Sequence, residues 1–145
     1  MAIAAGLAVF AVSCEKVGGE NSTLISTSSS RSHYEGRNCM DCHVRGEGGS
    51  GWFTVAGTVY DSTGRNIYNN ATVYLCSGPN GTGTILYKIP VDASGNYYTT
   101  ENVNYTGGLY TAVKGATSTI YMAGKITDGE CSRCHGRSTA KVWAK

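Results

Sequence analysis

With 145 residues and a formal net charge of +2, the chain has the length of one domain with a modest core. It contains no basic tract, which argues against a nucleic-acid partner. The composition includes 20 glycines and 10 tyrosines but only two prolines and two phenylalanines. Because tyrosine, threonine and valine favour strands and glycine favours turns, most of the chain is expected to be β-structure.

The chain begins with an uncharged apolar run, MAIAAGLAVFAV. This run is too short to span a membrane and fits the core of a secretion signal. The Ser13-Cys14 that follows resembles the lipobox of bacterial lipoproteins, although Ala11 stands where that motif usually has leucine. The resemblance implies a signal over residues 1–14, a lipid on Cys14, and a place in the cell envelope, as an outer-membrane lipoprotein or outside the cell. A buried apolar strand with a free thiol is the alternative.

Four further stretches follow the expected signal. Residues 15–32 are polar and rich in serine and threonine, so they are expected to form a flexible tether. Residues 33–51 contain the sequence CMDCH and a glycine-rich exit, GEGGSG. Residues 52–127 alternate like strands, and residues 128–145 contain a second motif, CSRCH, and a short tail. The pattern predicts a β-domain between two short motif segments.

Alternation with period two marks the strands of the β-domain. From Trp52 to Tyr60, apolar residues and glycine fall on one face and mostly polar residues on the other, which predicts a half-buried strand. Turn sequences such as DSTG and DASGN separate this strand from the next ones. The further strands are expected over residues 71–75, 85–91, 97–100, 109–113 and 118–126. Short strands at this spacing indicate a sandwich or a barrel.

The order GTVYDSTG, NNATVYL, VDASGNYYT and GLYTAV resembles the carboxypeptidase regulatory-like domain. The resemblance spans roughly residues 53–123 and rests on turn and strand signals. It implies an immunoglobulin- or transthyretin-like β-sandwich, flanked here by loop-rich motif segments. In that family the domain is usually a non-catalytic accessory, so the resemblance implies a scaffold.

Two CxxCH motifs carry the chemistry: Cys39, Cys42 and His43 form the first, and Cys131, Cys134 and His135 form the second. Two thiols at this spacing can add to the two vinyl groups of one haem, and the adjacent histidine then serves as the proximal ligand of the iron. A thioredoxin-like dithiol is one alternative, but it lacks a βαβ setting. A zinc site built from the four cysteines would leave both motif histidines without a role as ligands. Two covalently attached haem c groups are therefore the expected cofactors.

The distal ligands are the open question. His33 precedes Cys39 in SHYEGRNCMDCH, which resembles the H-x-x-G-x-x-C-x-x-C-H arrangement of multihaem cytochromes. The resemblance implies that His33 ligates an iron, either that of the haem it precedes or another; a surface histidine is the alternative. No histidine then remains for the second haem, and Met122 is the next candidate ligand, since a thioether can ligate haem iron. Met122 as a core residue, an open iron, and a ligand from a neighbouring subunit remain alternatives.

The cysteine count leaves one thiol without an expected role. Of the six cysteines, four are expected to hold haem and Cys14 to hold lipid. This leaves Cys76 as a semi-buried free thiol at the end of a strand. If Cys14 is not processed, a Cys14–Cys76 disulfide is the alternative.

The sequence therefore predicts an extracytoplasmic dihaem c-type cytochrome that carries electrons between redox partner proteins and is not an enzyme. In an antiparallel sandwich with an odd number of strands the two ends of the chain leave at opposite poles, and on that expectation the haems sit far apart within one copy. Conduction would then require haems of neighbouring copies to meet, as in an extracellular filament. A dihaem peroxidase-like enzyme and a surface-binding module with auxiliary haem are the two alternatives.

Overall fold

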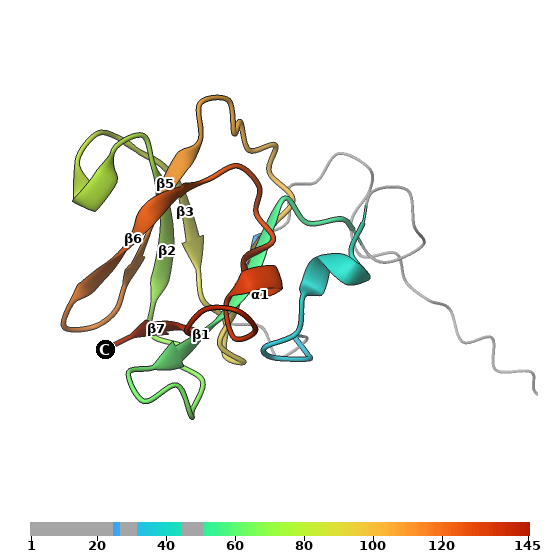
Figure 1. Ribbon diagram of the computed structural model, residues 1–145. Coiled ribbons are helices and arrows are strands. Elements are labelled where there is room, and N and C mark those ends of the chain that lie inside the picture. The colour runs from blue at the N-terminus through green and yellow to red at the C-terminus, as the bar shows by residue number, and fades with distance from the viewer. Residues whose placement is uncertain (1–24, 27–31, 45–50) are drawn as a thin grey trace, which may run out of the picture.

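The computed structural model describes residues 25–26, 32–44 and 51–145 of the chain (Figure 1). The expected signal over residues 1–14, with Cys14, lies outside the described residues. The described chain is mainly β and forms two sheets, with the strand orders β4-β1-β7 and β3-β2-β5-β6. The strands are β1 (Val55–Asp61), β2 (Thr72–Cys76), β3 (Ile85–Pro90), β4 (Asn96–Thr99), β5 (Leu109–Lys114), β6 (Thr119–Ile126) and β7 (Val142–Ala144). The predicted β-sandwich is confirmed.

Helical structure in the described residues is limited to short turns. Both motifs lie in such turns, the first in the 3-10 turn η1 (Cys39–Asp41) and the second in α1 (Cys131–Cys134). A third turn, η2 (Pro79–Gly81), connects β2 to β3. None of the helices in this part of the chain is long and apolar enough to cross a membrane.

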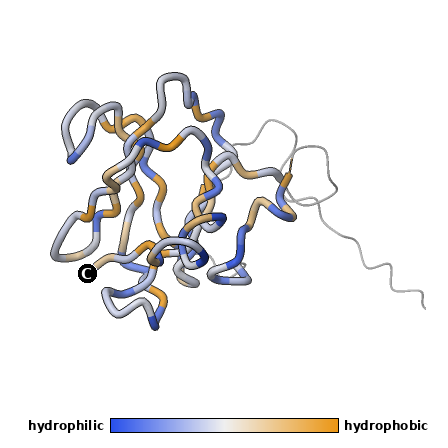
Figure 2. Tube along the Cα trace, viewed as in Figure 1, coloured by the Kyte–Doolittle hydropathy of each residue, from blue (hydrophilic) through white to orange (hydrophobic). Residues whose placement is uncertain are grey.

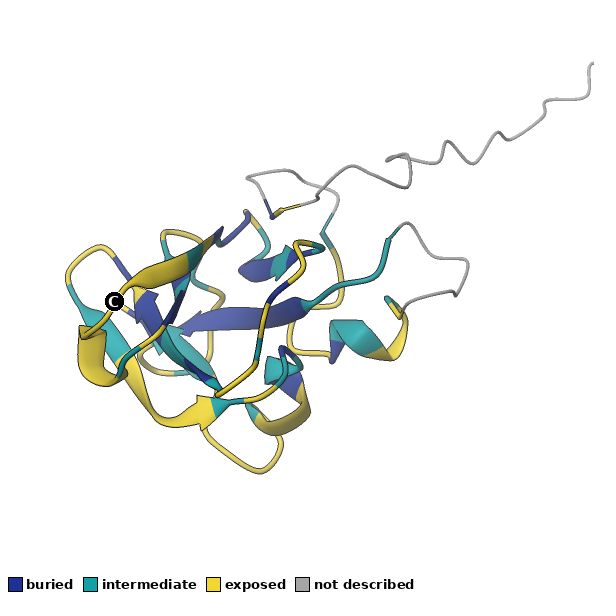
Figure 3. Cartoon of the chain, turned by 90° about the horizontal axis from the view of Figure 1, so that it is seen from above, coloured by how far each residue is buried: buried dark blue, intermediate teal, exposed yellow. Residues whose placement is uncertain are grey.

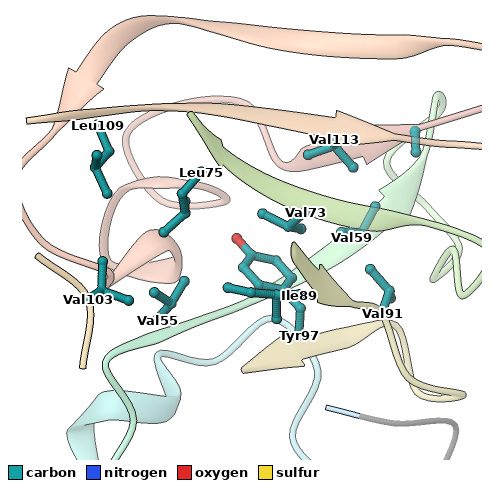
Figure 4. Close-up of a cluster of buried hydrophobic side chains, with 11 residues drawn as sticks. Val55, Val59, Val73, Leu75, Ile89, Val91, Tyr97, Val103, Leu109 and Val113 are labelled. Atoms are coloured by element: carbon teal, nitrogen blue, oxygen red, sulfur yellow. The ribbon is translucent and has the colours of Figure 1, made fainter. Parts of the chain in front are cut away.

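The core lies between the two sheets and is built from residues that alternate along the strands. The strands of both sheets carry hydrophobic residues (Figure 2), and the clearest alternation is along β2, where Val73 and Leu75 are buried and Thr72 and Tyr74 are partly exposed. The inward-facing side chains interdigitate as shown in Figure 4. They include Val55, Val59, Val73, Leu75, Ile89, Val91, Tyr97, Val103, Leu109 and Val113.

Leu75, on β2, has no exposed surface in this core. Leu75→Ala is expected to lower the free energy of unfolding by about 3 kcal/mol, because it removes buried apolar surface and leaves a cavity. The matched control is Leu86→Ala on the neighbouring β3, where the leucine is 48% exposed and the cost is expected to stay below about 0.5 kcal/mol. Denaturant unfolding of the two variants measures the difference. Equal losses would contradict the placement of Leu75 in the core.

β1 differs from its expected half-buried state, because Val55–Tyr60 is buried without interruption (Figure 3). Val55 and Val59 face the core, as the alternation predicts. Thr58 and Tyr60, on the opposite face, are also covered, although that face was expected to be solvated. Something other than the second sheet must therefore lie against the outer face of β1.

The two motif segments provide this cover. The backbone N–H of Gly36, in the first segment, donates to Oγ1 of Thr58 at 2.9 Å. At the other end of β1, the N–H of Ala56 donates to the carbonyl of Gly129, just before the second motif, at 3.0 Å. η1 and α1 both pack on β1. The three-stranded sheet is thus enclosed by the core on one side and by the motif segments on the other.

The C-terminal tail completes the three-stranded sheet. β7 runs parallel to β1, with Val59 opposite Val142 and Tyr60 opposite Trp143. The second motif therefore lies between two strands of the sandwich, β6 and β7, rather than beyond its last strand.

Candidate haem site

The two CxxCH motifs share one backbone hydrogen bond, although the first forms a 3-10 turn and the second an α-helical turn. The backbone N–H of His43 donates to the carbonyl of Cys39 at 3.0 Å, and the N–H of His135 donates to the carbonyl of Cys131 at 3.0 Å. Each bond joins residues four apart, so each motif closes one helical turn. Residues three and four apart lie on one face of a regular helical turn, so a closed turn of this kind can present both sulfurs and the imidazole to one bound group.

Both motif histidines are held through the same ring nitrogen. Nδ1 of His43 lies 3.0 Å from the carbonyl oxygen of Gly51, and Nδ1 of His135 lies 2.6 Å from that of Ala140. A carbonyl oxygen only accepts, so Nδ1 carries the proton in both rings. In a neutral imidazole Nε2 is then the unprotonated nitrogen that can ligate a metal. This support of a ligating histidine by a backbone carbonyl is usual at metal sites, and the donor set therefore fits an iron porphyrin.

The structure brings His33 to the first motif. The ring centroids of His33 and His43 are 6.1 Å apart, with an angle of 38° between the ring planes. With metal–nitrogen bonds of about 2 Å, two imidazoles on opposite sides of one metal have ring centres about 6 Å apart. The side chain of buried Asn96 holds this part of the chain, since its Nδ2 donates to the carbonyl of His33 at 3.2 Å and to Oγ of Ser32 at 2.7 Å.

Gly36 occupies the glycine position of the H-x-x-G-x-x-C-x-x-C-H pattern, and the structure shows why glycine is favoured there. Its φ of +78° lies in the left-handed region that favours glycine. A Cβ atom there would also lie 2.5 Å from the hydroxyl oxygen of Tyr60. The glycine therefore lets the chain turn against β1 between His33 and Cys39.

The two motifs lie side by side, and the expectation that they occupy opposite poles is wrong (Figures 1 and 3). Nδ2 of Asn38, which precedes Cys39, lies 3.5 Å from Oε2 of Glu130, which precedes Cys131. The reason is the path after β6: the chain returns to the edge of β1, where Glu130 bridges to Ala56, before it enters β7. The alternation pattern did not reveal β7, a strand of three residues, and so did not reveal this return.

A small pocket lies between the two motif segments. Gly36 contributes from the first segment, and Ser132, His135 and Gly136 from the second. Thr58 and Tyr60 of β1, with Lys141 and Val142 of the tail, complete its lining. His135 thus faces a space that both segments enclose.

Each motif has one covered and one exposed cysteine. Cys42 and Cys134 are exposed, whereas Cys39 and Cys131 are partly buried. Burial raises the pKa of the Cys39 thiol, and it raises that of the Cys131 thiol to about 11, against a lowering hydrogen bond from Tyr97. A redox-active dithiol instead needs a thiol with a lowered pKa. Neither Cys39 nor Cys131 therefore has the lowered pKa of an activated dithiol thiol.

Tyr97 and Gly57 support the second motif, and the sequence analysis did not single them out. Tyr97 lies on β4 opposite Gly57 of β1, and its hydroxyl hydrogen-bonds the Cys131 thiol. A Cβ atom at position 57 would come within 2.4 Å of that hydroxyl oxygen. Glycine at this position therefore allows Tyr97 to cross β1 and reach Cys131. A glycine inside a strand pattern often marks a close approach, and this is the signal in the sequence that could have identified Gly57.

Met122 is not brought to the second motif in this arrangement. It lies on β6 of the four-stranded sheet and is 37% exposed. α1, by contrast, packs on β1 in the other sheet. The prediction that Met122 ligates the second iron is not tested by this placement. Cys76 is a buried free cysteine at the end of β2.

Within residues 25–26, 32–44 and 51–145, no three His, Cys, Asp or Glu side chains are grouped closely enough to hold a metal ion together. Comparison of the chain with protein-family models, with curated proteins and with solved structures found no match.

Proposed function

We propose that the chain is a dihaem c-type cytochrome that transfers electrons outside the cytoplasm and catalyses no reaction of its own. The observation that carries the proposal is the shared geometry of the two motifs. In each, the backbone N–H of the histidine donates to the carbonyl of the first cysteine, and the ring Nδ1–H donates to a second backbone carbonyl. A haem bound there supplies an iron that takes up and releases one electron.

The residues of this chain would hold the two haems differently. Cys39 and Cys42 would attach the first haem, and His43 and His33 would ligate its iron. His33 is assigned here because of its 6.1 Å ring separation from His43. Cys131 and Cys134 attach the second ring, for which His135 is the one imidazole that remains, since the sequence has three histidines.

Because the two motifs lie next to each other, we also propose that one chain holds its two haems as a neighbouring pair. Electrons would then pass between the two haems of a single copy, and no second copy is needed for that step. Redox partner proteins and further copies of the chain, including a filament, are the proposed partners. A lipid on Cys14 is the proposed anchor in the cell envelope.

The decisive measurement is the intact mass of the protein made in a host that matures and exports c-type cytochromes. We expect a mass increase of two haems, haem colour that persists on a denaturing gel, and two reversible one-electron steps in a redox titration. The same mass should show residues 1–13 removed and lipid on Cys14. One haem or none would overturn the proposal, and turnover of hydrogen peroxide would favour the peroxidase-like alternative.

A further inference from the structure

The segment Gly51–Phe53 holds the first motif histidine by three separate contacts. The carbonyl of Gly51 accepts from Nδ1 of His43 at 3.0 Å. The backbone N–H of Phe53 donates to the carbonyl of His43 at 3.0 Å. The ring of Phe53 also stacks on the imidazole, with centroids 4.2 Å apart and planes inclined by 17°. The hydrogen bond to Nδ1 fixes the ring's direction, and the stacked ring opposes its rotation out of plane.

The ring of Phe53 is itself packed against a second aromatic ring. Its ring stacks on Tyr98 of β4, with centroids 4.7 Å apart and planes inclined by 23°. The next residue, Thr54, is tied to the sheet, since its N–H donates to the carbonyl of Thr99 at 2.8 Å and its carbonyl accepts from the Tyr105 hydroxyl at 2.9 Å. The row of rings therefore starts on the sandwich and ends on the imidazole.

The second motif lacks this feature. His135 has the equivalent Nδ1 contact, with the carbonyl of Ala140, and a longer contact with Oγ1 of Thr139. No aromatic ring stacks on it among the described residues. The two motif histidines therefore share the same kind of Nδ1 contact. They differ in that an aromatic ring stacks on the His43 imidazole and so restrains its plane.

We propose that Phe53 is a positioning residue that fixes the plane of the His43 imidazole and thereby sets the spectrum and the reduction potential of the first haem. The inference rests on the proposed function. Protein groups around an axial ligand are a recognised means of tuning haem iron. Leucine at position 53 would keep the apolar volume and the backbone contact but remove the flat surface against the imidazole.

The test is the electron paramagnetic resonance spectrum of the oxidised full-length protein, together with a redox titration. In Phe53→Leu we expect both haems to remain attached, the largest g value of one low-spin haem to shift, and the potential of that haem to change. Phe53→Tyr should restore the wild-type spectrum, because the flat ring returns. Tyr110→Leu, in the other sheet, is the matched control and should leave the spectrum unchanged.

A second variant separates the effect of losing the stacked rings from the effect of misfolding at position 53. Tyr98→Leu removes the supporting ring without touching His43, and it should shift the same g value by a smaller amount. Wild-type spectra in both leucine variants, with two haems attached, would overturn the role of Phe53. A wild-type protein that carries no haem would instead overturn the proposed function.

Discussion

Replacing His33 with alanine is expected to convert one of the two haems, and only one, from a low-spin to a high-spin or methionine-like spectrum. The reason is the separation of 6.1 Å between the His33 and His43 rings, which suits two axial ligands of one iron. Loss of an imidazole lowers the ligand field and changes the potential of that haem. Both haems should remain attached, because the four motif cysteines are untouched. Optical and paramagnetic spectra of the oxidised protein measure the change.

The matched control is Glu35→Ala, which alters an exposed residue of the same segment and should leave both spectra unchanged. Added imidazole should restore the low-spin spectrum of His33→Ala, because it can occupy the vacated position. If His33 serves a haem of a neighbouring copy instead, the variant should also disperse any filament. Unchanged spectra for both haems would show that His33 is a surface residue.

Removing the second pair of thiols, with Cys131→Ala and Cys134→Ala together, is expected to remove one haem and leave the low-spin His33–His43 haem in place. Removal of the first pair, with Cys39→Ala and Cys42→Ala, should leave the His135 haem. After reduction that haem should bind carbon monoxide, because the two other histidines of the sequence, His33 and His43, lie together at the first motif. Alanine is chosen because Cys131 packs against the core, where serine would bury an unpaired hydroxyl.

Intact mass, haem staining and carbon monoxide difference spectra measure both variants. Cys76→Ala is the control, because it removes a buried cysteine outside the motifs and should retain two haems. A control that loses haem would point to general misfolding. If the variant without the second pair of thiols binds carbon monoxide and the other does not, the assignment of His33 to the first haem is wrong.

The sequence alone was sufficient to predict six of the seven strands of the described residues and to name the candidate ligands. Alternation between residues 52 and 127 predicted the six strands found there, because side chains of a strand point alternately to its two faces. The two motifs were visible because haem attachment requires a local spacing of cysteine and histidine. Such signals depend on residues that are close along the chain, so no tertiary structure is needed to recognise them.

The tertiary structure alone decided how these parts meet. It placed the short strand β7 beside β1 and thereby brought the second motif next to the first, with Asn38 and Glu130 in contact. It also covered the outer face of β1, which alternation had predicted to be solvated. These features depend on contacts between residues far apart in the chain, such as Ala56 with Gly129. Local periodicity carries no information about such contacts, because they are determined by the packing of whole elements.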